Sequence, residues 1–212
     1  MQPLATPSPT SPSSAPSSAK DAARAQADRQ LIVFMAGIAQ GNQDAFASFY
    51  DQTHRLVFSL ALRILNDRGL AEEVTTDVFM QVWRQAANFE TMRGTPLSWL
   101  MTIARTRSID RLRASSHLRQ ESETLDAITH QAAPTDNPEK MSIYAERQKL
   151  VREALQQLTP DQRRLIEAAY FEGLSQSELA EKFALPLGTV KTRVRAGMML
   201  LKKVLVEQLG ND

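Results

Sequence analysis

The chain has 212 residues, and its 25 lysines and arginines are balanced by 24 aspartates and glutamates, which excludes a uniformly basic coat for nucleic acid. It contains no cysteine, so disulfides and thiolate zinc sites are excluded, and its three histidines lack metal-ligand spacing. No apolar run approaches the roughly 20 residues that cross a bilayer. We therefore expect one or two domains without a metal or cofactor, in which the local placement of charge carries the information.

The first residues of the chain differ in composition from the rest. Residues 1–18 are rich in proline, serine, threonine and alanine, and they lack the apolar core and basic flank of a secretory signal. Such a segment buries too little apolar surface to order itself. We therefore expect residues 1–27 to form a disordered extension.

Helical periodicity then predicts a first domain over residues 28–116. Its helices are expected at 28–40, 44–65, 70–87 and 97–113. A loop from Asn88 to Gly94 separates the last two helices, and Thr95 and Pro96 supply a cap and a first helical residue. On the third helix, Glu73, Asp77 and Gln81 lie on the polar side. The carboxylates of this side, Glu72, Glu73 and Asp77, have no partner histidine for metal or acid–base chemistry, which leaves a solvated face or a contact face for a partner protein.

The fourth helix carries arginines beside an aromatic ring. Five arginines and one acidic residue occur between residues 101 and 119. At helical spacing, one polar face contains Trp99, Thr102, Thr106, Asp110 and Arg113, flanked by Arg105. An aromatic ring and hydroxyls among arginines suit single-stranded DNA, in which bases stack and phosphates are neutralised. Trp99 packing against a neighbouring helix is an equal alternative, and Arg111 falls in the apolar arc, where it would brace the structure.

Residues 117–140 are predicted to be a flexible linker. Between Gln120 and Glu139 the charged residues are all acidic, and Pro134 and Pro138 discourage a continuous helix. A linker of this kind is either a soluble spacer or a segment that occupies a positively charged channel in a partner.

The second domain, residues 141–212, ends in a helix-turn-helix pattern. Thr159 with Gln162 and Ser175 with Glu178 both fit capping boxes, and Leu165, Ile166, Ala169 and Tyr170 are expected to face inward. Pro186 marks the start of a helix with an apolar back and a basic front. That front contains Lys191, Thr192, Arg195, Lys202 and Lys203.

This arrangement suits the major groove of DNA, and a surface helix with a solvated charged face is the alternative. Neither domain shows the alternation typical of strands. The predicted fold class is all-α, with two small helical domains joined by a flexible linker and a helix-turn-helix in the second.

Two stretches together resemble a known family. Ala71–Trp83 followed by Trp99–Arg113 is similar to the second region of bacterial sigma factors, and Gly173–Arg195 is similar to their fourth region. The short length, without a domain between the two, resembles the extracytoplasmic-function group (group IV) of the sigma-70 family. One departure is Thr106, where the family often has asparagine.

The resemblance implies a cytoplasmic promoter-specificity subunit that has no active site and needs no cofactor. The third helix, near Glu73, Asp77 and Gln81, would bind core RNA polymerase. The loop 88–94 and the fourth helix would open the minus-ten promoter element, with contacts from Trp99, Thr102, Arg105, Thr106, Asp110 and Arg113. The basic front of the last helix would read duplex minus-thirty-five DNA through Lys191, Thr192, Arg195, Lys202 and Lys203. The linker would thread toward the RNA path of the polymerase, and an anti-sigma factor is a further expected partner.

Three other functions account less well for these residues. A free-standing helix-turn-helix regulator would bind a palindromic duplex tightly without polymerase. A helical adaptor that binds no DNA would leave both basic clusters unexplained. An enzyme has the least support, because no phosphate loop, nucleophile–base pair or metal set is present.

Overall fold

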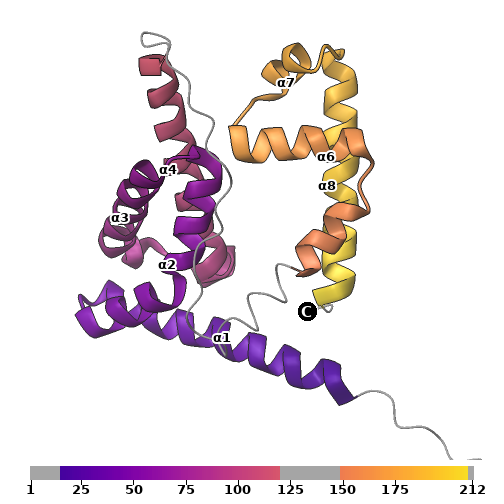
Figure 1. Ribbon diagram of the computed structural model, residues 1–212. Helices are drawn as coiled ribbons and strands as arrows, with labels where there is room; N and C mark the ends of the chain where they lie inside the picture. The colour runs from indigo at the N-terminus through magenta and orange to yellow at the C-terminus, as the bar shows by residue number, and fades with distance from the viewer. Residues whose placement is uncertain (1–14, 120–148, 210–212) are drawn as a thin grey trace, which may run out of the picture.

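The computed structural model describes residues 15–119 and 149–209, and these residues contain helices, turns and bends but no strand. The predicted all-α class is therefore confirmed. Figure 1 shows an N-terminal group of helices, α1 to α4, beside a C-terminal group that contains α6, α7 and α8. The expectations for residues 1–14 and for linker residues 120–140 fall outside the described residues.

The N-terminal domain is built around three helices that pack against one another. They are α2 (Gln43–Leu65), α3 (Arg68–Gln85) and α4 (Pro96–Arg119). Asn42 caps α2 by accepting a hydrogen bond from the Ala45 amide, and Asn66 ends the helix in the left-handed conformation that suits asparagine. The three helices bury Phe49, Val78 and Leu100 completely, so the apolar stripes predicted from the sequence form the core.

The first helix, α1 (Ala15–Ala39), begins at Ala15 instead of at Asp28. Its early part has the alanine-rich sequence Ala-Pro-Ser-Ser-Ala-Lys-Asp-Ala-Ala, in which alanine has the strongest helix propensity and proline occupies the first turn. Only its later part enters the core, through Leu31, Met35 and Ile38. Local propensity thus extends α1 beyond the segment that tertiary packing holds.

Two short turns replace the predicted loop between α3 and α4. They are η1 (Ala86–Asn88) and η2 (Thr91–Arg93). Met92 at the tip is 95% exposed, whereas Phe89 contacts Trp99 at the start of α4, with 5.7 Å between ring centroids. The loop is therefore anchored at one aromatic side chain and projects another apolar side chain into solvent.

The C-terminal domain consists of a helix over residues 149–156 and the elements that follow it. These are α6 (Pro160–Glu167), the π-helical turn η3 (Ala168–Glu172), α7 (Gln176–Lys182) and α8 (Leu187–Leu209). Both predicted capping boxes are present, with Thr159 and Gln162 at α6 and Ser175 and Glu178 at α7. The domain core includes Leu165, Leu179 and Val190.

The π-helical turn changes which side chains face inward at the end of α6. Tyr170 was predicted to be buried, but it is 41% exposed, and Ala168 is buried. A π turn has more residues per turn than an α-helix, so it shifts the register of every side chain after it. The prediction for Tyr170 was wrong because it assumed uninterrupted α-helical spacing.

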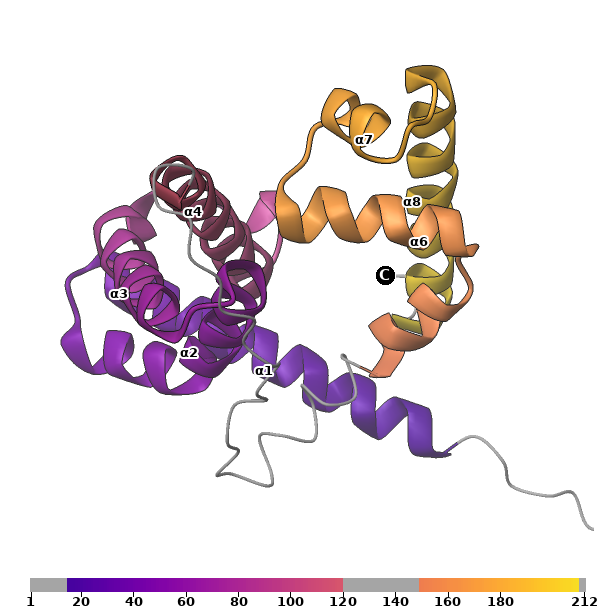
Figure 2. The ribbon, with the colours of Figure 1, turned by 45° about the horizontal axis from the view of Figure 1, so that its top comes forward.

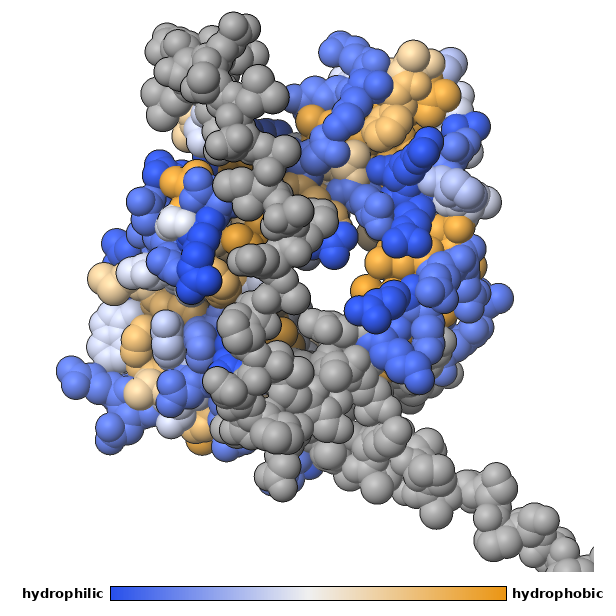
Figure 3. Space-filling view, in the orientation of Figure 1, coloured by the Kyte–Doolittle hydropathy of each residue, from blue (hydrophilic) through white to orange (hydrophobic). Residues whose placement is uncertain are grey.

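The two domains touch each other through this turn. The end of α6 that leads into η3 points toward α4 in both ribbon views (Figures 1 and 2). Phe171 packs against the core cluster of the N-terminal domain. Figure 3 shows a mainly hydrophilic surface on both domains, with apolar residues in smaller areas between.

Candidate nucleic-acid and polymerase interfaces

The basic front of α8 is exposed as the sequence predicts. Lys191, Thr192, Arg195, Lys202 and Lys203 are all exposed, whereas Val190 on the opposite side is fully buried. The Thr192 hydroxyl donates to the Gly188 carbonyl at 2.9 Å, and the Lys203 Nζ lies 3.9 Å from Glu207 Oε1. Three of these side chains, Lys191, Thr192 and Arg195, lie in the first half of α8. Lys202 and Lys203 lie in its second half.

Arg193 lies on a different side of α8 from these residues. Its Nη1 is 2.7 Å from Asp161 Oδ2 near the start of α6, which directs the guanidinium toward the domain itself. The backbone of Gly197 lies against α6, because a Cβ placed there would be 2.7 Å from Ile166 Cδ1. The ion pair and the close approach together fix how α8 is presented to solvent.

The capped helix α7 supports α8 from the other side. The Ser175 amide donates to Glu178 Oε2 at 2.6 Å, and the Glu178 amide donates to Ser175 Oγ at 3.3 Å. The hydrogen bonds from the Ser175 side chain and backbone lower the pKa of Glu178 below its ordinary value. After α7 the chain turns at Ala184, which has a φ of 50° and so adopts a left-handed conformation. These local interactions build the tight turn of the helix-turn-helix.

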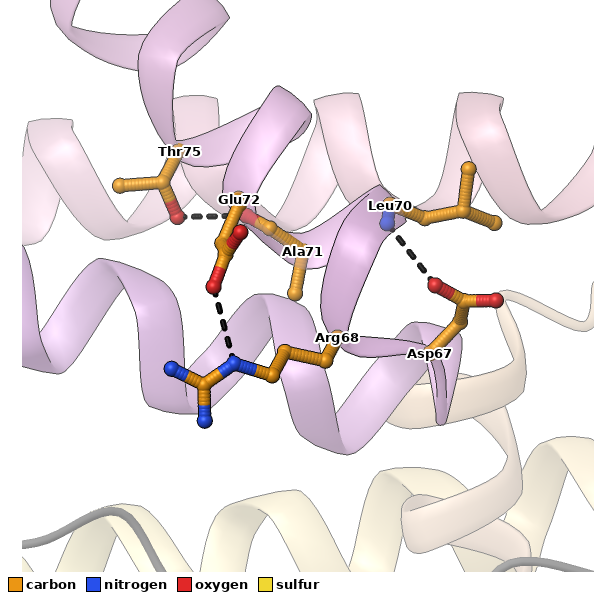
Figure 4. A network of polar contacts seen from close by, with 6 residues as sticks. All are labelled: Asp67, Arg68, Leu70, Ala71, Glu72 and Thr75. Carbon is orange, nitrogen blue, oxygen red and sulfur yellow. Dashed lines mark hydrogen bonds and ion pairs between the residues drawn. The ribbon is translucent and has the colours of Figure 1, made fainter.

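The start of α3 is fixed by local contacts, shown in Figure 4. Asp67 caps the helix by accepting from the Leu70 amide at 2.9 Å, and Arg68 pairs with Glu72 at 2.9 Å. The buried Thr75 hydroxyl donates to the Ala71 carbonyl one turn earlier. The helix is thereby set so that its polar side faces away from the core.

That polar side contains the three residues predicted to contact a partner. Glu73 Oε2 accepts from Arg111 Nη2 at 2.7 Å, and Gln81 Oε1 accepts from Arg107 Nε at 2.8 Å. Asp77, one turn from each, is exposed. Arg111 therefore contacts α3, which is consistent with the expected bracing role, and the polar side of α3 is joined to α4 by two side-chain hydrogen bonds.

The polar face of α4 divides into residues that face solvent and residues that hold other parts of the protein. Thr102, Thr106 and Asp110 are exposed, while the half-buried Trp99 packs against Phe89. The Thr102 hydroxyl donates back to the Ser98 carbonyl at 2.8 Å. Packing is therefore one use of Trp99 in this structure, and the residue as a whole is only partly buried.

Arg105 and Arg113 contact the C-terminal domain. Arg105 donates from Nη2 to the Ala169 carbonyl at 2.7 Å and from Nε to the Tyr170 carbonyl at 2.9 Å. Its Cζ also lies 4.9 Å from the centroid of the Tyr170 ring. Burial raises the pKa of Tyr170, and the positive charge of Arg105 partly offsets that rise. Arg113 donates from Nη2 to the Gly173 carbonyl at 2.8 Å.

Sequence reasoning missed the residues that receive these arginines. The acceptors are backbone carbonyls, which no side-chain pattern marks, and they lie 65 and 60 residues away from their donors. Phe171 was a possible signal, because it is an aromatic residue placed directly after a helix that already has an apolar face. The sequence predicted only a flexible linker between the two domains, and it did not predict this direct contact.

No group of three or more histidine, aspartate or glutamate side chains suited to a metal ion occurs within residues 25–115 and 149–207, whose side chains the structure describes. Over the same part of the chain, no helix combines the length and apolar character needed to cross a bilayer.

Comparison with known proteins adds an independent observation. Residues 49–117 match the family model described as Sigma-70 region 2, and residues 148–201 match that of Sigma-70, region 4. The extracytoplasmic-function (ECF) RNA polymerase sigma factor SigK of Mycolicibacterium vanbaalenii is 37% identical over 176 residues, covering 83% of this chain and 89% of that protein. SigK of Mycobacterium ulcerans is 38% identical over 175 residues, covering 82% and 93%.

Among solved structures, Rhodobacter sphaeroides SigE in complex with the anti-sigma ChrR matches with a TM-score of 0.43 and 28% identity. That match covers 80% of this chain and 97% of the other.

Proposed function

This chain belongs to the extracytoplasmic-function group of the sigma-70 family, and from that premise we propose how its helices divide the work of a sigma factor. In this proposal α8 reads the minus-thirty-five element, α4 and the turns before it bind the opened minus-ten element, and α3 contacts core RNA polymerase. The observation that carries the proposal is the exposed front of α8, which presents Lys191, Thr192 and Arg195 from its first half.

The role of α8 follows from the geometry of a helix-turn-helix. The second helix of this motif enters the major groove with its N-terminal residues at the base edges. In this proposal Thr192 and Arg195 contact bases, and an arginine that contacts guanine is worth about 1–3 kcal/mol of discrimination. Lys202 and Lys203 lie two turns further on, where lysines neutralise phosphates without reading sequence.

The role of α4 follows from its side chains and from the loop before it. Trp99 offers a ring for stacking, and Thr102, Thr106 and Asp110 add polar groups on the exposed side of the same helix. Arg105 and Arg113 supply positive charge for the phosphates of the separated strand. Met92, which is 95% exposed in the preceding turn, adds an apolar side chain at the same end of the domain.

The role of α3 rests on the exposed carboxylates of Glu73 and Asp77, with Gln81 one turn beyond.

We expect the isolated chain to bind DNA weakly and with little selectivity, because opening a duplex costs unstacking energy that this small domain does not supply alone. Selectivity then requires polymerase to hold the two domains. An anti-sigma factor is a further proposed partner, on the basis of family resemblance.

The test is transcription by purified core polymerase on genomic fragments, with and without this chain. New transcripts that start at a shared pair of promoter elements are the expected result. Tight and selective duplex binding by the chain alone would contradict the assignment and favour a free-standing regulator.

Two variants of α8 then test its division of labour. Arg195→Ala should lose discrimination between the cognate and a scrambled minus-thirty-five element, by about 1–3 kcal/mol. Lys203→Ala should weaken both DNAs alike and reduce the salt dependence of binding. Equal losses on cognate and scrambled DNA in Arg195→Ala would remove the base-reading role from that residue.

A further inference from the structure

Two arginines assigned to the minus-ten strand are already engaged by the chain itself. Arg105 donates to the carbonyls of Ala169 and Tyr170, and Arg113 donates to the carbonyl of Gly173. These carbonyls lie at the C-terminal end of α6 and its π-helical turn. The end of a helix leaves carbonyls without intrahelical partners and carries partial negative charge. The C-terminal domain thus presents to α4 the kind of acceptor that DNA phosphates would present.

Apolar packing strengthens the same contact. Phe171 packs against the N-terminal core cluster, and Arg63 at the end of α2 lies over its ring, with 4.0 Å from Cζ to the centroid. Gly173 fits closely against α4, because a Cβ there would lie 2.4 Å from Ile109 Cγ2. Its φ of 68° also favours glycine. We call the packing of residues 168–173 on α2 and α4 the closing contact.

We propose that the closing contact is an autoinhibitory device, in which the C-terminal domain occupies Arg105 and Arg113 and single-stranded DNA must displace it to bind α4. This inference rests on the proposed role of α4 in holding the minus-ten strand. The two occupants are mutually exclusive, since both use the same guanidinium groups as hydrogen-bond donors. The free protein therefore binds a single strand only through the fraction of molecules in which the contact is open.

The opening is measured as a distance between the domains. Because the chain contains no cysteine, the substitutions Asp51→Cys on α2 and Glu181→Cys on α7 allow two spin labels to be attached specifically. Both positions are exposed and lie outside the closing contact. Pulsed electron paramagnetic resonance of the full chain should give one narrow distance distribution. In parallel, fluorescence anisotropy measures binding of a fluorescein-labelled oligothymidylate.

The informative variants break the contact without touching the proposed DNA residues. Phe171→Ala and Arg63→Ala should broaden the distances toward longer values and tighten oligothymidylate binding, by about tenfold if one molecule in ten is open beforehand. Arg68→Ala is the matched control, since Arg68 is an exposed arginine whose ring contact, 5.8 Å to Phe58, stays within its own domain. Arg68→Ala removes the same positive charge as Arg63→Ala, and it should neither lengthen the distances between the spin labels nor tighten oligothymidylate binding.

Arg105→Ala separates this inference from the proposed function. It should open the contact and also weaken oligothymidylate binding, in contrast to Phe171→Ala. Unchanged distances in both Phe171→Ala and Arg63→Ala, with native circular dichroism, would overturn the closing contact. Longer distances without tighter binding would overturn the competition. Failure of every variant and of the parent chain to bind oligothymidylate would overturn the DNA role of α4 itself.

Discussion

Replacing Gly197 on α8 by alanine should destabilise the C-terminal domain, although alanine is the better helix former. The new Cβ would lie 2.7 Å from Ile166 Cδ1 and 3.3 Å from Gln162 Cβ. Carbon atoms in contact prefer about 3.5–4.0 Å, so α6 and α8 must separate or Ile166 must change rotamer. Ile166 is buried, and overpacking of such a site costs about 1–3 kcal/mol. The higher helix propensity of alanine offsets about 1 kcal/mol of this cost, which leaves a net loss of about 0–2 kcal/mol in the free energy of unfolding.

The same substitution at Gly188 provides the control. A Cβ at Gly188 would meet no atom within 4 Å, so Gly188→Ala should stabilise α8 by up to about 1 kcal/mol. The glycine-to-alanine substitution in α8 is thus expected to raise stability at position 188 and to lower it at position 197. Gly197→Val, which adds two methyl groups beyond the Cβ of alanine at the crowded site, should cost about 3 kcal/mol or more.

Native-state hydrogen exchange of amides in α6 and α8 is the appropriate assay. Both tryptophans, Trp83 and Trp99, belong to the N-terminal domain, so tryptophan fluorescence would report the other domain. Exchange gives opening free energies amide by amide in the domain that was changed. If Gly197→Ala protected these amides as much as Gly188→Ala does, the close contact between α6 and α8 would be refuted.

Three further predictions concern single positions. Asp77→Lys should abolish co-purification with core polymerase and leave the thermal midpoint nearly unchanged, because Asp77 is exposed; Glu72→Lys, on another side of α3, should keep core binding. Ala184→Gly should stabilise the helix-turn-helix by up to about 1.6 kcal/mol in thermal unfolding. The left-handed conformation costs alanine about 1–2 kcal/mol, and the greater unfolded-state entropy of glycine offsets about 0.4–1 kcal/mol of that gain. The Glu178 carboxylate should stabilise the start of α7 fully above pH 4.5, and this stabilisation should be lost as the pH falls through the lowered native pKa of Glu178. In Ser175→Ala, carboxyl NMR titration should show the pKa of Glu178 rising toward 4.5.

Local chemistry accounts for what the sequence predicted well. Ser175 with Glu178 and Thr159 with Gln162 form capping boxes across three residues, so their partners are visible in the sequence itself. The front of α8 follows in the same way from a period of 3.6 residues. The DNA-facing and partner-facing roles of these residues stay predictions until binding is measured.

What the sequence could not predict depends on distance along the chain or on small departures from α-helical geometry. Arg105 lies in a plausible DNA-binding face, and nothing near it marks its acceptors 64 and 65 residues later. The π-helical turn that exposes Tyr170 inserts a register shift that periodicity does not encode. The helical residues of α1 before Asp28 were missed because a poor apolar composition argues against packing, whereas alanine needs little packing to favour a helix.

If α3 binds polymerase and α4 binds the strand as proposed, the two hydrogen bonds between α3 and α4 link these two surfaces thermodynamically. A partner that draws Glu73 or Gln81 away from Arg111 or Arg107 leaves a guanidinium group without its α3 acceptor, on the helix assigned to the DNA strand. The released guanidinium group, which does not belong to the proposed DNA face itself, can then donate to a phosphate of the strand. Linkage is reciprocal, so the strand must then favour polymerase binding by the same factor. Cooperativity between the two ligands of a sigma factor can in this way arise from four side chains, without any rearrangement of the backbone.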